Sequence, residues 1–140
     1  MSAPGYAALF FTVVLLVTTA YFLMGGLPLL ILTHDTHVDQ RFIQRFFDIY
    51  YKAAILAAVG AAVSYALWGR VLFAIGAAVM ATIAVLLRRR ILPAMEHIAA
   101  QIQANDTSAI RSFRKVHSAA LLVNLTQLVT LVWGLTKLSL

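Results

Sequence analysis

The sequence predicts an all-α integral membrane protein, an antiparallel four-helix bundle with amphipathic extensions at its cytoplasmic end. Three observations predict this fold class. Of the 140 residues, 62% are hydrophobic and only 11% are charged, whereas soluble domains carry about 25% charged residues. Four apolar stretches approach the roughly 20 residues that cross a bilayer as a helix. Basic residues flank these stretches, as is typical of membrane helices. We expect residues 1–140 to form a single four-span domain.

The first span is expected at about residues 6–32. Its apolar run is longer than the hydrophobic region of a signal peptide, and no basic residue precedes it, so we expect it to be retained. Gly25, Gly26 and Pro28 interrupt this helix near one end. A proline removes a backbone hydrogen bond, so a kink is the simple expectation. Alternatively, the glycine pair lets a cofactor or a partner helix approach closely.

The second and third spans are expected at about residues 49–68 and 71–87. Only Gly69 and Arg70 separate them, so they must form a tight hairpin. Alanines recur along both spans, and small residues let membrane helices pack closely. The second helix should begin early, near Val38, with Thr33 or Asp35 as its N-cap. Asp48 and Lys52 are four residues apart on it, a spacing that suits an ion pair. The aromatic residues of this lead-in fit a belt at headgroup depth; they are Phe46, Phe47, Tyr50 and Tyr51.

The third helix should continue past Pro93 to a turn at Asn105 and Asp106. The fourth span is expected at about residues 117–138. His117, Asn124 and Gln127 are spaced by seven and three residues, which places them on one helical face. Polar side chains in a membrane span usually face the bundle interior. This face should therefore point inward, either as part of a site or as a set of hydrogen bonds between helices.

The distribution of charge predicts an orientation. Nine of the eleven basic residues fall after the first span or between the third and fourth, and only Arg70 and Lys137 fall on the other side. The positive-inside rule then places the nine in the cytoplasm and both termini in the periplasm, in a bacterial inner membrane. All five acidic residues and all four histidines share the cytoplasmic side.

These histidines and acids are the candidate ligands of a haem b or of a transition-metal ion. Imidazole and carboxylate suit zinc or iron, and paired imidazoles suit haem. The proposed cofactor-binding residues are His34, His37, His117, Asn124 and Gln127, and the proposed metal ligands are His34, Asp35, His37, Asp39, Glu96 and His97. Their spacing matches no strong metal signature. A simpler interpretation is that polar residues gather where the chain meets water.

Other classes of site and partner are disfavoured. The chain has no cysteine, so it has no disulfide and no thiolate site. The basic residues behind its net charge of +6 flank apolar runs and form no basic stripe on a soluble helix. We therefore expect no nucleic-acid partner. The expected partners are the lipid bilayer, a hydrophobic small molecule, and a membrane-protein partner or a second copy of the chain.

Two segments carry a family resemblance. "FRKVHSAALLVNLTQLV" in the fourth span resembles the last span of small four-helix membrane proteins of the anthrone-oxygenase-like group. "LPLLILTH" is similar to the end of the first span in the membrane protoporphyrinogen oxidase, within the wider copper-resistance-D-like cluster. The fourth span departs from that oxidase. The resemblance implies that His34 and His117 are the first histidines to test as ligands or catalytic groups.

Two functions from different classes remain open. The first is a membrane protein with a haem or metal redox site at its cytoplasmic end, acting on or near a hydrophobic substrate such as a porphyrin, quinone or polyketide. The alternative is a non-catalytic subunit or interaction protein of a larger membrane complex. A small transporter or channel is less favoured, because no charged residue falls in mid-membrane. Whether the protein is an enzyme is left open.

Overall fold

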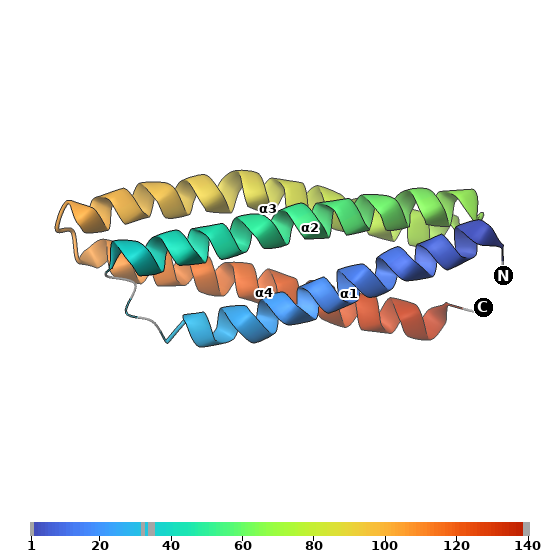
Figure 1. Cartoon of the computed structure of the whole chain (residues 1–140), viewed down its shortest axis with the longest axis horizontal. Coiled ribbons are helices and arrows are strands. Elements are labelled where there is room, and N and C mark those ends of the chain that lie inside the picture. The colour runs from blue at the N-terminus through green and yellow to red at the C-terminus, as the bar shows by residue number, and fades with distance from the viewer. Residues whose placement is uncertain (1, 32, 34–35, 139–140) are drawn as a thin grey trace.

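In the part of the chain that the structure describes, residues 2–31, 33 and 36–138, the computed structural model contains four α-helices. They are α1 (Ala3–Leu29), α2 (His37–Leu67), α3 (Val71–Gln103) and α4 (Ser108–Lys137). Each is long and apolar enough to cross a membrane. Figure 1 shows the helices lying along one long axis, with both chain ends at one end of the molecule. We call this the terminus end, and the end with the α3–α4 connection the loop end.

The connections between helices follow from local chemistry. Gly69 has a φ of +78°, a conformation that suits glycine, and it turns the chain from α2 into α3 as the sequence predicts. Asn105 has a φ of +67° and ends α3, and the Asp106 carboxylate accepts from the Ser108 amide at 3.1 Å. The predicted turn at Asn105 and Asp106 is therefore confirmed. The N-cap of α2 is Thr36, whose hydroxyl oxygen accepts from the Asp39 amide at 3.2 Å.

That cap differs from the two predicted caps. Thr33 lies three residues before Thr36, and Asp35 lies outside the described residues. The first helix also differs from expectation, because it continues through Gly25 and Gly26 and ends one residue after Pro28. Pro28 thus lies in the last turn, where its missing N–H removes the hydrogen bond to the Met24 carbonyl, and the helix ends one residue later. The glycine pair does not interrupt the helix.

The predicted extensions are present as helix. The second helix starts at His37, and α3 continues past Pro93 to Gln103. At 1.5 Å per residue, the 33 residues of α3 span about 50 Å, well beyond the 30 Å or so of a bilayer core. Asp48 joins the two helices, because it accepts from Arg88 at 2.8 Å and pairs with Lys52 at 2.6 Å. The predicted Asp48–Lys52 pair is confirmed.

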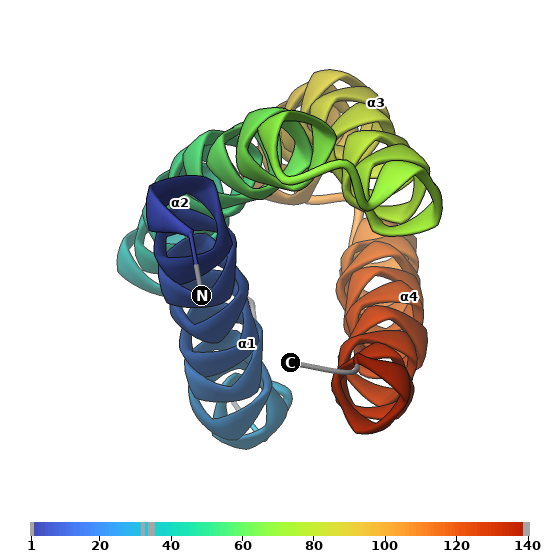
Figure 2. The same cartoon turned by 90° about the vertical axis from the view of Figure 1, so that its right-hand side faces the viewer.

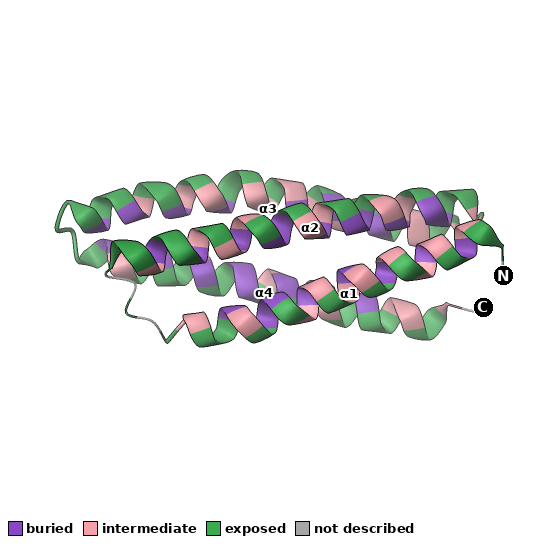
Figure 3. Cartoon of the chain, in the orientation of Figure 1, coloured by how far each residue is buried: buried purple, intermediate pink, exposed green. Residues whose placement is uncertain are grey.

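The buried surface forms one stripe along each helix (Figure 3). Seen from the terminus end, α2 and α3 lie side by side, and α1 and α4 stand below them on opposite sides (Figure 2). Small residues line the contact between α2 and α3, as close packing in a membrane requires. They are Ala54, Ala57, Ala58 and Ala61 on α2 and Ala77, Ala81 and Ala84 on α3, all at most 8% exposed.

Helix α1 packs against α2 and α4 at its glycines. A Cβ on Gly25 would lie 2.8 Å from the Phe46 ring of α2, and one on Gly26 would lie 2.5 Å from Leu121 of α4. The same holds nearer the terminus end, where a Cβ on Gly60 would lie 2.6 Å from Phe11. The close approach that the glycine pair predicts is therefore made by the chain's own helices.

Candidate functional site

Of the predicted metal ligands that the structure describes, His37 already has hydrogen-bond partners and the others do not complete a site. His37 is exposed, and its Nε2 lies 2.9 Å from the Arg41 guanidinium while its Nδ1 lies 2.6 Å from the Gln103 side-chain nitrogen. Arg41 can only donate, so Nε2 is the acceptor and Nδ1 carries the ring proton, which it donates to Gln103 when the side-chain amide is turned to present its oxygen. A metal would need a free lone pair on one of the two ring nitrogens.

The other predicted ligands do not complete a site. Glu96 and His97 are exposed side chains of α3, and Asp39 lies in the first turn of α2. Among the described residues, no three histidines or acids lie close enough to hold a metal ion. His34 and Asp35 lie outside the described residues. The structure therefore gives the metal site no support, and it stays a prediction.

His117 lies inside the bundle, as predicted, where it connects two helices. It is fully buried, and its Nε2 is 3.1 Å from the Gly26 carbonyl oxygen of α1. The last turn of α1 tightens, so that the Leu30 amide donates to the Leu27 carbonyl. This leaves the Gly26 carbonyl without its usual helical donor. The imidazole packs edge-on against Phe47, with 5.1 Å between ring centroids.

Asn124 and Gln127 continue the same inward face of α4. Asn124 is fully buried, and its side-chain oxygen accepts from the Tyr50 hydroxyl at 2.6 Å. Its side-chain nitrogen donates to the Ala120 carbonyl at 2.8 Å. The Nε2 of Gln127 is buried with no hydrogen-bond partner among the described residues. The predicted inner polar face is confirmed, and at Asn124 it joins α4 to α2.

The aromatic residues of α2 do not form the predicted belt. Phe47, Tyr50 and Tyr51 are at most 6% exposed. They surround Phe22 of α1, whose ring stacks on Tyr50 with 3.9 Å between centroids and lies 5.3 Å from Phe46. These side chains face inward because they pack against the aromatic ring of Phe22. The belt prediction was therefore wrong for Phe47, Tyr50 and Tyr51.

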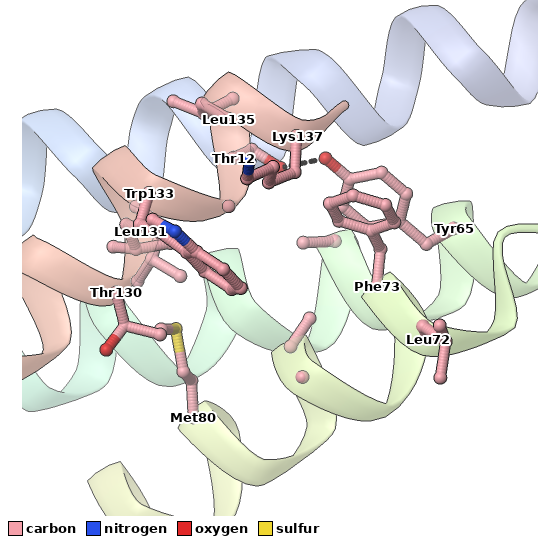
Figure 4. A pocket seen from close by; sticks show the side chains of 15 residues that line it. Thr12, Tyr65, Leu72, Phe73, Met80, Thr130, Leu131, Trp133, Leu135 and Lys137 are labelled. Carbon is pink, nitrogen blue, oxygen red and sulfur yellow. Dashed lines mark hydrogen bonds between the residues drawn. The ribbon is translucent and has the colours of Figure 1, made fainter. Parts of the chain in front are cut away.

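A cavity of about 440 Å³ lies at the terminus end and contacts all four helices (Figure 4). Such a volume is typical of small-molecule sites. Its lining is almost entirely apolar and includes Leu15, Ala61, Leu72, Phe73, Ala77, Met80, Leu131, Trp133 and Leu135. Leu72 and Trp133 are 82% and 63% exposed, so the cavity opens to the outside of the bundle.

Two glycines in the wall keep this space open. Gly76 of α3 and Gly134 of α4 both line the cavity, and a Cβ on either would meet nothing within 4 Å. At Gly25, Gly26 and Gly60 the corresponding space is filled by a neighbouring side chain. Protein interiors are close-packed and contain few voids larger than a water molecule. Gly134 is half-buried and Gly76 is exposed, so the protein leaves this space open to a molecule that enters from outside the bundle.

Few polar groups line the cavity. The hydroxyls of Thr12 and Tyr65 lie 3.0 Å apart, and Thr12 also donates to the Ala8 carbonyl at 2.7 Å. The Tyr65 ring is stacked between Trp68 and Phe73, with centroid distances of 6.1 and 5.4 Å. Lys137 is the charged residue of the lining. In Figure 4 its side chain points toward the Thr12–Tyr65 pair. This is the arrangement of an apolar ligand site with a small polar group at one end.

Sequence reasoning missed this cavity. The glycines, Thr12 and Tyr65 are spread over four helices and follow no periodicity. A weak signal was present, because Gly76 and Gly134 fall inside helices that are otherwise good helix formers, where glycine costs about 1 kcal/mol relative to alanine. A packing or functional reason is expected for such positions.

No family model, no curated protein and no solved structure matches the chain. The resemblance to the anthrone-oxygenase-like group and the membrane protoporphyrinogen oxidase therefore stays a prediction.

Proposed function

We propose that this chain is an integral membrane protein of four antiparallel spans that binds a hydrophobic small molecule in the cavity lined by Thr12, Tyr65, Gly76 and Gly134. The observation that carries the proposal is the open volume of about 440 Å³ at two glycines in otherwise packed helices. The apolar side chains around this opening gain van der Waals contacts when a molecule fills it.

The surroundings of the cavity favour a ligand that arrives through the bilayer. Its lining residues Leu72 and Trp133 are exposed on the outside of helices that are apolar enough to cross a membrane. In a bilayer that outside is lipid. A hydrophobic molecule dissolved in the membrane reaches the cavity without crossing water, which agrees with the hydrophobic substrate expected from the sequence.

The charges give the proposed orientation. Most of the basic residues lie between the middle of the bundle and the loop end, beginning with Arg88, Arg89 and Arg90 at the middle of α3, whereas Arg70 and Lys137 lie at the terminus end. By the positive-inside rule the loop end is cytoplasmic, and the cavity lies in the periplasmic half of a bacterial inner membrane. Single cysteines at Asp39 and Lys137 should then be labelled from opposite sides by an impermeant thiol reagent. Labelling from the same side would overturn the four-span topology.

The binding proposal is tested by photolabelling in lipid nanodiscs. The probe is a long-chain alkyl diazirine, which has no polar group and reports only apolar occupancy. We expect adducts on cavity residues such as Tyr65, Phe73 and Met80. The blocking variant Gly134→Leu puts a side chain where none now contacts a neighbour, so it should fold and lose most of this labelling.

The matched control is Ala78→Leu. Ala78 is exposed on α3 and lies outside the cavity lining, so the substitution adds a leucine to a lipid-facing position without entering the site. We expect its labelling to equal that of the wild type. Labelling spread over lipid-facing residues, or an equal yield in both leucine variants, would contradict the proposal. A structure in which a second copy of the chain fills the cavity would contradict the proposal as well.

A further inference from the structure

The hydrogen bonds of Thr12 determine whether the buried Thr12–Tyr65 pair in the cavity wall offers a ligand a donor or an acceptor. A threonine hydroxyl has a single proton. Thr12 donates it to the Ala8 carbonyl, at 2.7 Å. The 3.0 Å contact between Thr12 and Tyr65 must then be donated by the Tyr65 hydroxyl. Both hydroxyl protons are used within the protein, so what this pair offers a ligand is a hydrogen-bond acceptor, the Tyr65 oxygen.

This acceptor is held in place. Tyr65 is 3% exposed and its ring stacks on both Trp68 and Phe73, which holds the phenol oxygen in place. Both Thr12 and Tyr65 line the cavity. A ligand oxygen without a proton, as in a ketone, an ester or an ether, would meet an oxygen lone pair there. A ligand hydroxyl would meet a matched acceptor.

We infer that the ligand of this cavity is a hydrophobic molecule that carries a hydroxyl group, of the long-chain or ring alcohol or phenol class, and that this hydroxyl donates to the Tyr65 oxygen. The inference rests on the proposed binding function and specifies its ligand. The Lys137 ammonium, at the same end of the cavity, can only donate. A ligand hydroxyl both donates and accepts, so it can donate to the Tyr65 oxygen and accept from the Lys137 ammonium.

The test compares two competitors that differ only in this property. A long-chain primary alcohol and the methyl ketone of the same carbon number are titrated against the alkyl diazirine in nanodiscs. In the wild type we expect the alcohol to displace the probe at about fivefold lower concentration, the ratio expected for one net hydrogen bond. In Tyr65→Phe this preference should fall to within about twofold, since the fixed acceptor is lost.

The variant Thr12→Val gives a result that a merely structural role would not give. Without the Thr12 oxygen, the Tyr65 hydroxyl loses its acceptor and turns its proton to the cavity. We expect the preference to reverse, with the ketone now displacing the probe at the lower concentration. One control should keep the wild-type preference: Tyr6→Phe, at a tyrosine that is 64% exposed and outside the cavity lining.

The outcomes separate the two proposals. If the diazirine does not label the cavity at all, the binding function falls. If it labels the cavity but alcohol and ketone compete equally in the wild type, the binding function stands and the hydroxyl inference falls. If the preference for alcohol over ketone survives in both Tyr65→Phe and Thr12→Val, another group recognises the ligand hydroxyl and the inference is likewise overturned.

Discussion

The hydrogen bond between Tyr50 and Asn124 offers the most specific stability prediction. The Tyr50 hydroxyl donates to the Asn124 side-chain oxygen at 2.6 Å, and both residues are buried, at 6% and 0% exposure. Hydrogen bonds between membrane helices contribute about 0.6 kcal/mol on average and up to about 1.7 kcal/mol in the strongest measured pairs. The short distance and complete burial place this bond in the upper half of that range. We therefore expect a coupling energy of about 1 kcal/mol between the two side chains.

A double-mutant cycle measures that coupling. The variants are Tyr50→Phe, Asn124→Ala and the double substitution, unfolded reversibly with sodium dodecyl sulfate in mixed micelles and followed by helical circular dichroism. Asn124→Ala alone should cost about 1–3 kcal/mol, because it also leaves the buried Tyr50 hydroxyl without its acceptor. Tyr6→Phe, an exposed position, combined with Asn124→Ala should be additive. A Tyr50–Asn124 coupling below about 0.3 kcal/mol, the level at which independent sites add, would refute the reasoning.

Three further predictions concern other contacts. Gly26→Ala should lower the free energy of unfolding by about 1–3 kcal/mol, because its Cβ would lie 2.5 Å from Leu121. Gly134→Ala should be neutral or stabilising by up to about 1 kcal/mol. Equal effects of the two variants in the same unfolding assay would contradict the difference in packing. Asp48→Asn should cost about 0.5–1 kcal/mol at low salt and less at high salt, since its partners are partly exposed; a cost independent of salt would argue against an ion-pair origin. His117→Ala should lower the free energy of unfolding by about 2–4 kcal/mol, because the buried imidazole of α4 packs against α1 and bonds to its Gly26 carbonyl. The visible absorption spectrum should stay unchanged. Loss of a Soret band in His117→Ala would instead support the haem site.

The sequence predicts the helical architecture well because that architecture depends on local properties. The length of each apolar run determines the four helices, and Gly69, Asn105 and Asp106 mark two of the turns. The pairing of Asp48 with Lys52 follows from their spacing of four residues. The inward face of His117 and Asn124 follows from helical periodicity. Each of these features can be read without knowing which helix lies next to which.

The contacts between helices could not be predicted in this way. Phe47 and Tyr50 have the composition and depth of an aromatic belt, and only the position of Phe22 on another helix shows that they are buried. His37 bonds to Gln103, a residue that is 66 positions away in the chain. Such partners are fixed by the docking of helices, on which a single sequence carries little information.

The cavity shows the same limit most clearly. Gly26 and Gly134 are both glycines in apolar helices, and the sequence does not distinguish them. One is covered by Leu121 and the other faces open space. The difference depends on which side chain of a neighbouring helix happens to lie opposite. A binding site made of missing side chains on four helices therefore becomes visible only once the helices are placed together.

The central claim is that this cavity holds a hydrophobic molecule, and native mass spectrometry of the purified protein tests it most directly. The wild type and Ala78→Leu should each retain one small hydrophobic molecule per chain after gentle removal of detergent. Gly134→Leu, whose new side chain occupies the open space beside α4, should be recovered at the mass of the bare chain. Spectra in which all three proteins carry the same adduct, or in which none does, would contradict the account.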